Sequence, residues 1–228
     1  MIEKIIRLYQ AETLGLAIKG EIGGWVSSVG EKLKSEDLVY NPWAYAIVHR
    51  LALECAPTMV SGILKLFPET NSVVDFGSGT GGYIAEFRKH GLMTEGFEYS
   101  QIARDIAHKK LGVELQPFDL NTFTKYERDF DLSISIEVAE HLVPELGDRL
   151  VDVCCQHAPL VIFTAAPPGQ PGQGHINLQP KSYWIDKFAQ RGFQFNNSKT
   201  EQLANYLKTN LIRGFFLADN IGVYQKNR

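Results

Sequence analysis

The run Val73-Val74-Asp75-Phe76-Gly77-Ser78-Gly79-Thr80-Gly81-Gly82-Tyr83 is the part of the sequence best suited to holding a ligand. Its β-branched residues predict a strand, and its glycines predict a tight turn that leads into a helix. Glycine lets a backbone turn sharply and approach a ligand, and the first turn of a helix presents free N–H groups. At the carboxyl edge of an open parallel sheet, such a turn binds nucleotide-like ligands.

The glycine spacing fits two ligand classes. Gly77, Gly79 and Gly82 satisfy the dinucleotide fingerprint G-x-G-x-x-G, whereas Gly77, Gly79 and Gly81 satisfy G-x-G-x-G. Asp75 favours the second class, because its carboxylate repels a pyrophosphate and attracts a ligand with a cationic centre and an ammonium group. The motif also follows about 70 residues of chain, whereas a dinucleotide-binding domain more often begins with it.

On these residues the chain resembles the class I S-adenosylmethionine-dependent methyltransferases. The resemblance runs from about Ser72 to the C-terminus, and Val-Val-Asp-Phe-Gly-Ser-Gly-Thr-Gly is similar to the first motif of that family. It implies S-adenosylmethionine as cofactor, and it implies that the first motif holds the cofactor through Asp75, Gly77, Ser78, Gly79 and Gly81.

Two further cofactor contacts are implied by the same resemblance. Glu98 and Tyr99 end the expected second strand, where the family places an acid that binds both ribose hydroxyls. Asp119 follows the third strand, where an acid often holds the adenine amino group and an apolar neighbour, here Leu120, lies against the ring. For Asp119, a turn-forming or helix-capping role is the alternative.

The fourth strand carries the run Ile136-Glu137-Val138-Ala139-Glu140-His141. It is similar to the "EVLEHV" run of methyltransferases of the quinone-biosynthesis type, and this implies that Ile136 and Glu137 lie beside the methionine part of the cofactor. By the same resemblance His141 lies just past the strand, near the transferred methyl group.

His141 and His175 are the candidate catalytic residues. Methyl transfer is an in-line displacement with a neutral leaving group, so the sequence predicts no metal, and a hydroxyl acceptor gains from a base such as histidine. His175 lies in a polar segment rich in Pro, Gly and Gln after the fifth strand, which we interpret as a lid or a substrate-contacting loop. For both histidines a structural hydrogen bond to the backbone is the alternative.

Strands that alternate with amphipathic helices predict the scaffold for these residues. We expect an α/β, Rossmann-like, seven-stranded, mostly parallel sheet with an antiparallel last strand, helices on both faces and a helical N-terminal cap. The expected domains are residues 1–70, the cap, in which Pro42 and Pro57 each open a helix, and residues 71–228, the cofactor-binding domain. The strands are expected at Val73-Val74 and at residues 94–99, 113–118, 130–136, 160–165, 193–195 and 222–225.

Composition and charge narrow the function. The 228 residues are 44% hydrophobic with a net charge of −3 and a pI near 6.1, which argues against a nucleic-acid partner. There is no uninterrupted apolar run of about 18 residues, so we expect no membrane partner, and the N-terminus lacks the pattern of a signal peptide. Three cysteines without metal spacing indicate reduced thiols and a cytoplasmic location. The sequence predicts no particular oligomeric state.

The function expected from these observations is methyl transfer to a small-molecule acceptor, at a hydroxyl oxygen of a sugar or secondary metabolite. A small-molecule nitrogen acceptor is the first alternative, and a non-catalytic S-adenosylmethionine-binding protein is the second. A nucleic-acid amino-methyltransferase is disfavoured, because the tetrad Asn/Asp-Pro-Pro-aromatic is missing after the fourth strand, where the chain reads Ile-Glu-Val-Ala.

Overall fold

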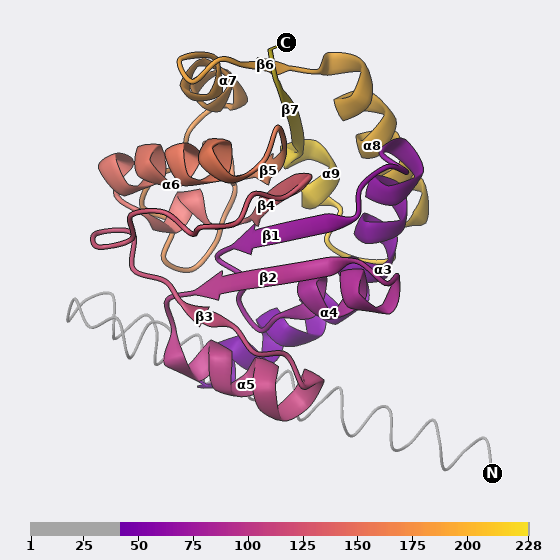
Figure 1. Cartoon of the computed structure of the whole chain (residues 1–228), viewed down its shortest axis with the longest axis vertical. Coiled ribbons are helices and arrows are strands. Elements are labelled where there is room, and N and C mark those ends of the chain that lie inside the picture. Colours follow the sequence, from indigo (N-terminus) through magenta and orange to yellow (C-terminus); the bar gives the residue numbers. More distant parts are fainter. Residues whose placement is uncertain (1–41, 228) are drawn as a thin grey trace.

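The computed structural model describes residues 42–227 (Figure 1). Tyr40 and the rest of the expected N-terminal cap before Pro42 lie outside the described residues, and the division at residue 70 stays a prediction. The strands are β1 Ser72–Phe76, β2 Met93–Glu98, β3 Gln116–Pro117, β4 Leu132–Ile136, β5 Leu160–Thr164, β6 Phe193–Phe195 and β7 Gly222–Lys226. The helices are α3 Pro42–Leu66, α4 Gly82–Lys89, α5 Gln101–Leu111, the 3-10 turn η1 Ala139–His141, α6 Pro144–His157, α7 Lys181–Ala189, α8 Asn197–Asn210 and α9 Phe216–Asn220.

All seven of these strands form one sheet in the order β3-β2-β1-β4-β5-β7-β6. Strands β1 to β5 run parallel, and β7 lies antiparallel between β5 and β6. The expected seven-stranded, Rossmann-like sheet with an antiparallel last strand is confirmed. The strand order reverses between β1 and β4, and the crevice beyond the carboxyl ends of these strands is where open α/β sheets bind ligands.

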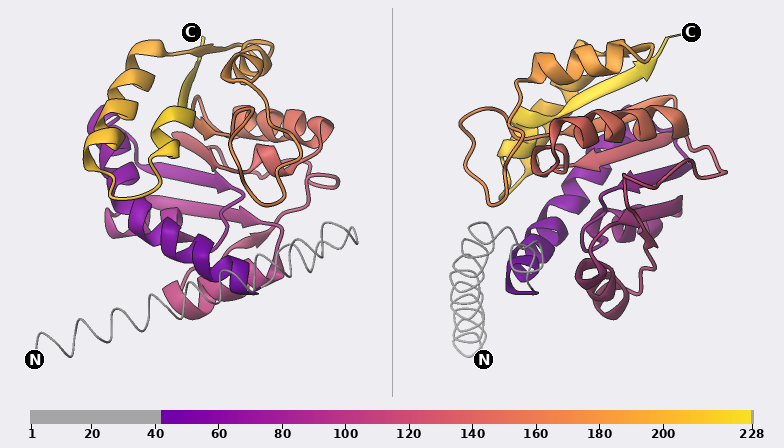
Figure 2. Two further views of the ribbon diagram at one scale, coloured as in Figure 1. Left: turned by 180° about the vertical axis from the view of Figure 1, so that it is seen from behind. Right: turned by 90° about the vertical axis from the view of Figure 1, so that its left-hand side faces the viewer.

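Alternate residues of the central strands build two cores, as expected for strands buried on both faces. One face packs against α3, α4, α8 and α9, and the other packs against α6 and α7, so the helices lie on opposite sides of the sheet (Figures 1 and 2). The first face carries Val73, Leu132, Ile134, Leu160, Ile162 and Val223, and the second carries Val74, Phe76, Phe97, Val161, Phe163 and Tyr224. This packing holds the carboxyl ends of β1, β2 and β4 side by side.

Helix ends follow the sequence signals closely. The Ser100 side chain accepts a hydrogen bond from the Ala103 N–H at the start of α5, and Gly112 ends that helix with a φ of 63°. Pro144 is the first residue of α6. Helix α8 begins after Asn196, whose side chain caps it by accepting from the Lys199 N–H.

Three expectations about elements are corrected. The third strand has two residues instead of the expected 113–118, because Val113 and Leu115 pack between α4 and α5 and Pro117 has no N–H to donate. Pro57 does not open a new helix, since α3 continues through it. The turn η1 and the short helix α9 were not expected.

From the sequence we expected no segment long and apolar enough to cross a membrane, but helix α3 contains one. By length and composition alone, residues 45–66 are apolar enough to cross a membrane, with a mean hydropathy of 1.2, because few charges fall in any one window. A core helix passes the same test, and Met59, Val60 and Ile63 of α3 are fully buried in the first core.

Candidate cofactor and acceptor site

The glycine loop connects β1 to α4 with a left-handed backbone at Gly77, Gly79 and Gly81. At Gly77, with φ 85°, a Cβ atom would lie 2.5 Å from Cγ2 of Val138, so a side chain there would collide with the segment that follows β4. At Gly79, with φ 53°, a Cβ atom would meet nothing within 4 Å among the described residues. Gly79 therefore faces open space at the carboxyl edge of the sheet.

Backbone hydrogen bonds hold this loop against β2. The N–H groups of Gly77 and Ser78 both donate to the Phe97 carbonyl, at 2.8 and 3.0 Å, and the Ser78 hydroxyl donates to the Asp75 carbonyl at 2.9 Å. The Gly79 N–H donates to Oε2 of Glu98 at 2.7 Å. Two residues that the sequence predicts for one cofactor, Gly79 and Glu98, are thus in direct contact.

The Glu98 carboxylate is 8% exposed and is held at both oxygens. Its Oε1 accepts a 2.8 Å hydrogen bond from the Ser100 N–H, at the start of α5. Burial raises the pKa of Glu98 to about 7, and the bonds from Ser100 and Gly79 oppose this shift. Each oxygen keeps acceptor capacity for a further donor, as an acid that binds a ribose requires.

Asp75 is a buried carboxylate whose two oxygens have no hydrogen-bond partner within residues 42–227. Burial, together with the nearby charge of Glu98, raises its pKa to about 8. A buried carboxylate without a partner is costly in an isolated protein. A cationic ligand at the strand end would supply the missing partner, which is the reasoning that favoured S-adenosylmethionine over a dinucleotide.

Glu137 follows β4 in a left-handed conformation with φ 54°, which is strained for a residue with a side chain. Its N–H donates to the Thr164 hydroxyl at 2.8 Å, and its carboxylate accepts from Nδ2 of Asn220 at 3.0 Å and from Nε2 of Gln170 at 3.3 Å. Asn220 was not expected to be a site residue, and Gln170 was expected only as part of the polar segment after β5. Neighbouring Ile136 is partly buried and packs against the first core.

His141 and His175 are brought together, with ring centroids 4.9 Å apart in an edge-to-face arrangement. Nδ1 of His141 lies 3.2 Å from the Gly174 carbonyl, and Nδ1 of His175 lies 3.4 Å from the Gln170 carbonyl. The backbone hydrogen bonds that the sequence left as an alternative are therefore present. Burial lowers the pKa of His141 to about 4, with His175 contributing, so this imidazole is neutral near pH 7.

Glu140 completes this group of side chains and was not expected to be functional. It is fully buried, and neither carboxylate oxygen has a hydrogen-bond partner in the described part of the chain. Burial, and then the charge of Glu137, raise the pKa of Glu140 to about 9. Its carbonyl accepts from the N–H groups of Ile176 and Asn177, which ties the loop after β5 to η1.

The remaining predicted cofactor residues line the edge of this region. Oδ1 of Asp119 accepts from the N–H and the side chain of Asn121, both at 2.9 Å, so Asp119 forms the turn that was its alternative role. Leu120 is buried in the second core, and Tyr99 is 64% exposed beside Glu98. Their contacts with adenine or ribose stay predictions.

Helix α3 also reaches the glycine loop. Nδ1 of His49 lies 2.9 Å from the Thr80 hydroxyl, and a Cβ atom at Gly82 would lie 2.9 Å from Cβ of Ala52. No local sequence signal predicts the contact of His49 with the loop. The close approach at Gly82 explains why a glycine begins α4.

Comparison with known proteins agrees with this geometry. Residues 47–148 match the family described as "Methyltransferase domain", and no curated protein sequence matches the chain. Three solved structures with a similar fold illustrate the neighbours. The amino pentose methyltransferase CalS10 of Micromonospora echinaspora is 14% identical, with a TM-score of 0.61, over 81% of this chain and 97% of that one.

The sugar N-methyltransferase KedS8 of Streptoalloteichus sp. ATCC 53650 is 16% identical, with a TM-score of 0.58, over 81% and 93% of the two chains. Magnesium protoporphyrin IX methyltransferase (ChlM) of Synechocystis PCC 6803, with bound S-adenosylmethionine, is 15% identical, with a TM-score of 0.54, over 92% and 97%. At these identities the likeness to solved structures shows the fold, and the family match adds the methyltransferase domain. The matched residues contain the glycine loop and Glu98, so the family match and the shared fold both support a class I methyltransferase that uses S-adenosylmethionine as cofactor.

Proposed function

We propose that the protein transfers the methyl group of S-adenosylmethionine to a hydroxyl oxygen of a small molecule, a sugar or a secondary metabolite. The observation that carries this proposal is the His141–His175 pair. His141 ends the turn η1 after β4, and His175 lies in the segment after β5. An acceptor hydroxyl beside the pair would lie next to the cofactor's sulfonium group, if that group sits near Asp75 and Glu137 as predicted.

In the proposed reaction, the hydroxyl donates its proton to an imidazole as its oxygen attacks the methyl carbon. The carbon–sulfur bond breaks in line with the attack, and its electron pair stays on sulfur, which leaves S-adenosylhomocysteine. His175 lies in the segment between β5 and α7, and we expect this ring to meet the acceptor.

A sugar as acceptor is supported by two proteins of similar structure, a sugar N-methyltransferase and an amino pentose methyltransferase. These names also favour the first alternative, a nitrogen acceptor, since KedS8 is a sugar N-methyltransferase. The acidic pI supports a small molecule over a nucleic acid. A location in the cytoplasm and the absence of nucleic-acid and membrane partners remain part of this proposal.

The experiment is a methyl-transfer assay with labelled S-adenosylmethionine on a panel of paired sugars that differ only in a hydroxyl or an amino group at one carbon. Label in the hydroxyl members supports the proposal, and label confined to the amino members supports the nitrogen alternative. Tight binding of S-adenosylmethionine without turnover on any member would favour the non-catalytic alternative. The variants H141A and H175A should each lower turnover and leave cofactor affinity unchanged. Normal turnover in both variants would show that neither histidine acts as the base.

A further inference from the structure

Glu140, His141 and His175 form a cluster of side chains that the methyl-transfer chemistry alone does not require. One carboxylate oxygen of Glu140 and one ring nitrogen of each histidine all lie within 4.8 Å of one another. The three residues come from η1 and from the loop after β5, and the two backbone hydrogen bonds to the Glu140 carbonyl fasten that loop to η1. Backbone contacts therefore hold the two segments that carry these side chains beside each other.

The Glu140 carboxylate supplies an independent indication of a ligand. It has no exposed surface, and its oxygens have no hydrogen-bond donor among the residues that the structure describes. A buried carboxylate is normally paired or bound to a metal ion, because burial removes the water that stabilises its charge. The nearest other acid is Glu137, which adds negative charge near it, and its own carboxylate is bonded to Asn220 and Gln170.

Both imidazoles have the backbone contact that metal-binding histidines commonly have. Nδ1 of each ring points to a backbone carbonyl, Gly174 for His141 and Gln170 for His175. A carbonyl only accepts, so Nδ1 carries the proton in each neutral ring and Nε2 carries the lone pair. Metal-binding histidines commonly donate their other N–H to such a carbonyl, which fixes the tautomer and the ring.

We propose that Glu140, His141 and His175 bind one divalent cation of the first transition row. Two imidazoles with one carboxylate suit zinc, iron or manganese better than magnesium or calcium, which prefer oxygen ligands alone. Three protein ligands leave coordination positions open, as catalytic metal sites do. This departs from the expectation, drawn from the sequence, that no metal is used.

The cation has a role that rests on the proposed function. Its open positions face the region where the acceptor is proposed to lie, so a hydroxyl oxygen of the acceptor would become a ligand. A bound cation would lower the pKa of such a hydroxyl, which would then lose its proton to solvent water before the attack. In this form of the proposed function the two histidines are ligands, and the imidazole is not the proton acceptor. An acceptor with two neighbouring oxygens would bind more tightly than one with a single oxygen, because it fills two positions.

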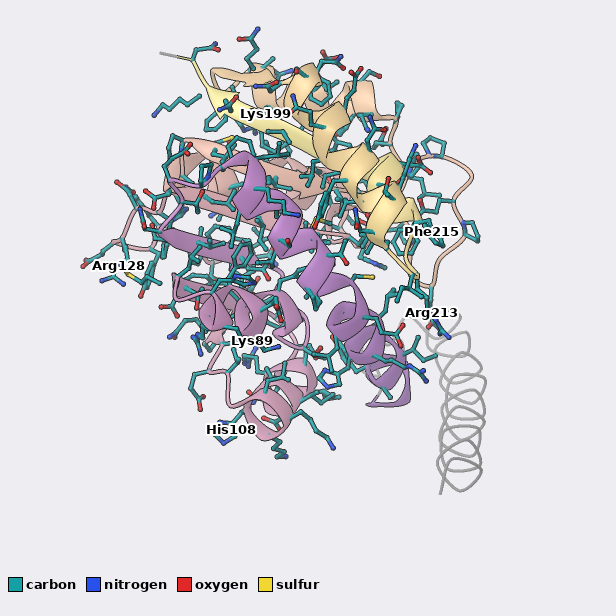
Figure 3. The ribbon with its side chains drawn as sticks, turned by 90° about the vertical axis from the view of Figure 1, so that its right-hand side faces the viewer. Lys89, His108, Arg128, Lys199, Arg213 and Phe215 are labelled. Carbon is teal, nitrogen blue, oxygen red and sulfur yellow. The ribbon has the colours of Figure 1, made fainter. Side chains whose placement is uncertain are left out.

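Metal binding is tested on the full chain without a histidine tag, first stripped with a chelator. Calorimetry with zinc and with manganese, and the visible absorption of added cobalt, should show one site per chain. The variants E140Q, H141A and H175A should each weaken binding by roughly tenfold or more. H108A is the matched control, because His108 lies beside Glu114 on the outer surface of α5 (Figure 3) and belongs to no group of three possible ligands within residues 42–227. This variant should bind as the unmodified chain does.

Unfolding temperatures measured with and without the cation show whether each variant is folded. E140Q keeps the shape of the buried side chain, so a folded E140Q protein without binding supports the proposal. Absence of binding by the unmodified chain, or binding that survives all three substitutions, would overturn it. Metal binding is measured without cofactor or acceptor, and the methyl-transfer assay on the metal-loaded chain tests the proposed function separately, so the two failures are distinguishable.

Discussion

The backbone N–H of Gly79 donates a 2.7 Å hydrogen bond to the carboxylate of Glu98, which joins the turn after β1 to the end of β2. Glu98 thereby has two connected tasks. It fixes the glycine loop through one oxygen, and it fixes the start of α5 through the other, at the Ser100 N–H. An acid held in this way is positioned before a ribose arrives, which reduces the ordering that cofactor binding would otherwise require.

Replacement of Glu98 by alanine should weaken binding of S-adenosylmethionine by about 1–3 kcal/mol, the cost of leaving buried hydrogen-bonding groups without partners. Calorimetric titration of the cofactor measures this effect. Glu95→Ala is the control on the same strand, because Glu95 bonds the Tyr126 hydroxyl and not the loop. Equal affinities of E98A and E95A would show that Glu98 does not contact the cofactor.

Gly79→Val should abolish measurable cofactor binding and leave the protein folded. A Cβ atom at this position meets nothing within 4 Å, so its cost to the fold is limited to the left-handed φ of 53°, about 1–2 kcal/mol. Gly112→Val is the matched control, since Gly112 has φ 63° and similar open space at the end of α5. Denaturant unfolding should give similar losses for the two variants, while calorimetry should show lost binding for G79V alone. Unchanged affinity in G79V would contradict the assignment of this space to the cofactor.

Asp75 should make the stability of the cofactor-free protein fall as the pH rises from about 4 to about 8. Its folded pKa is about 8, whereas an aspartate in an unfolded chain titrates near pH 4. Between these values the folded state holds more protons than the unfolded state, so raising the pH favours unfolding. Asp75→Asn should flatten this part of the profile of unfolding free energy against pH. A profile that is the same in the variant would contradict the raised pKa.

The same carboxyl group also predicts how cofactor affinity depends on pH. A cationic ligand stabilises ionised Asp75, so binding should release a proton below pH 8, and affinity should rise between pH 6 and 8. Calorimetry in buffers with different ionisation enthalpies measures the released proton. The D75N variant should bind without this release, and a release that persists in D75N would assign it to another group.

Local patterns in the sequence predict the scaffold and part of the site. Residues that follow neighbouring parallel strands must meet at one edge of the sheet, so the strand order alone brings Asp75, Gly79 and Glu98 together. The shortened β3 escapes prediction, because an apolar residue such as Leu115 serves equally well in a strand or between two helices.

Contacts from distant elements could not be predicted. Asn220 reaches Glu137 from α9 and His49 reaches Thr80 from α3, and neither contact leaves a periodic pattern or a spacing in the sequence. Amide and imidazole side chains in helices are most often ordinary surface residues, so only the three-dimensional arrangement distinguishes these two. The burial of Glu140 is unexpected for the same reason, since its charge alone predicts exposure.

Backbone strain at Glu137 leads to the last prediction. Glycine adopts the left-handed φ of 54° without the steric cost that a side chain incurs there. Glu137→Gly and Glu137→Gln both remove the charge, and glycine also removes the strain at the expense of the bonds to Asn220 and Gln170. We expect E137G to be more stable than E137Q by about 1 kcal/mol, as measured by denaturant unfolding, and yet to be the poorer methyltransferase. If E137G is the less stable of the two, the hydrogen bonds of the side chain stabilise the fold by more than the strained backbone destabilises it. The left-handed turn is then a consequence of those bonds.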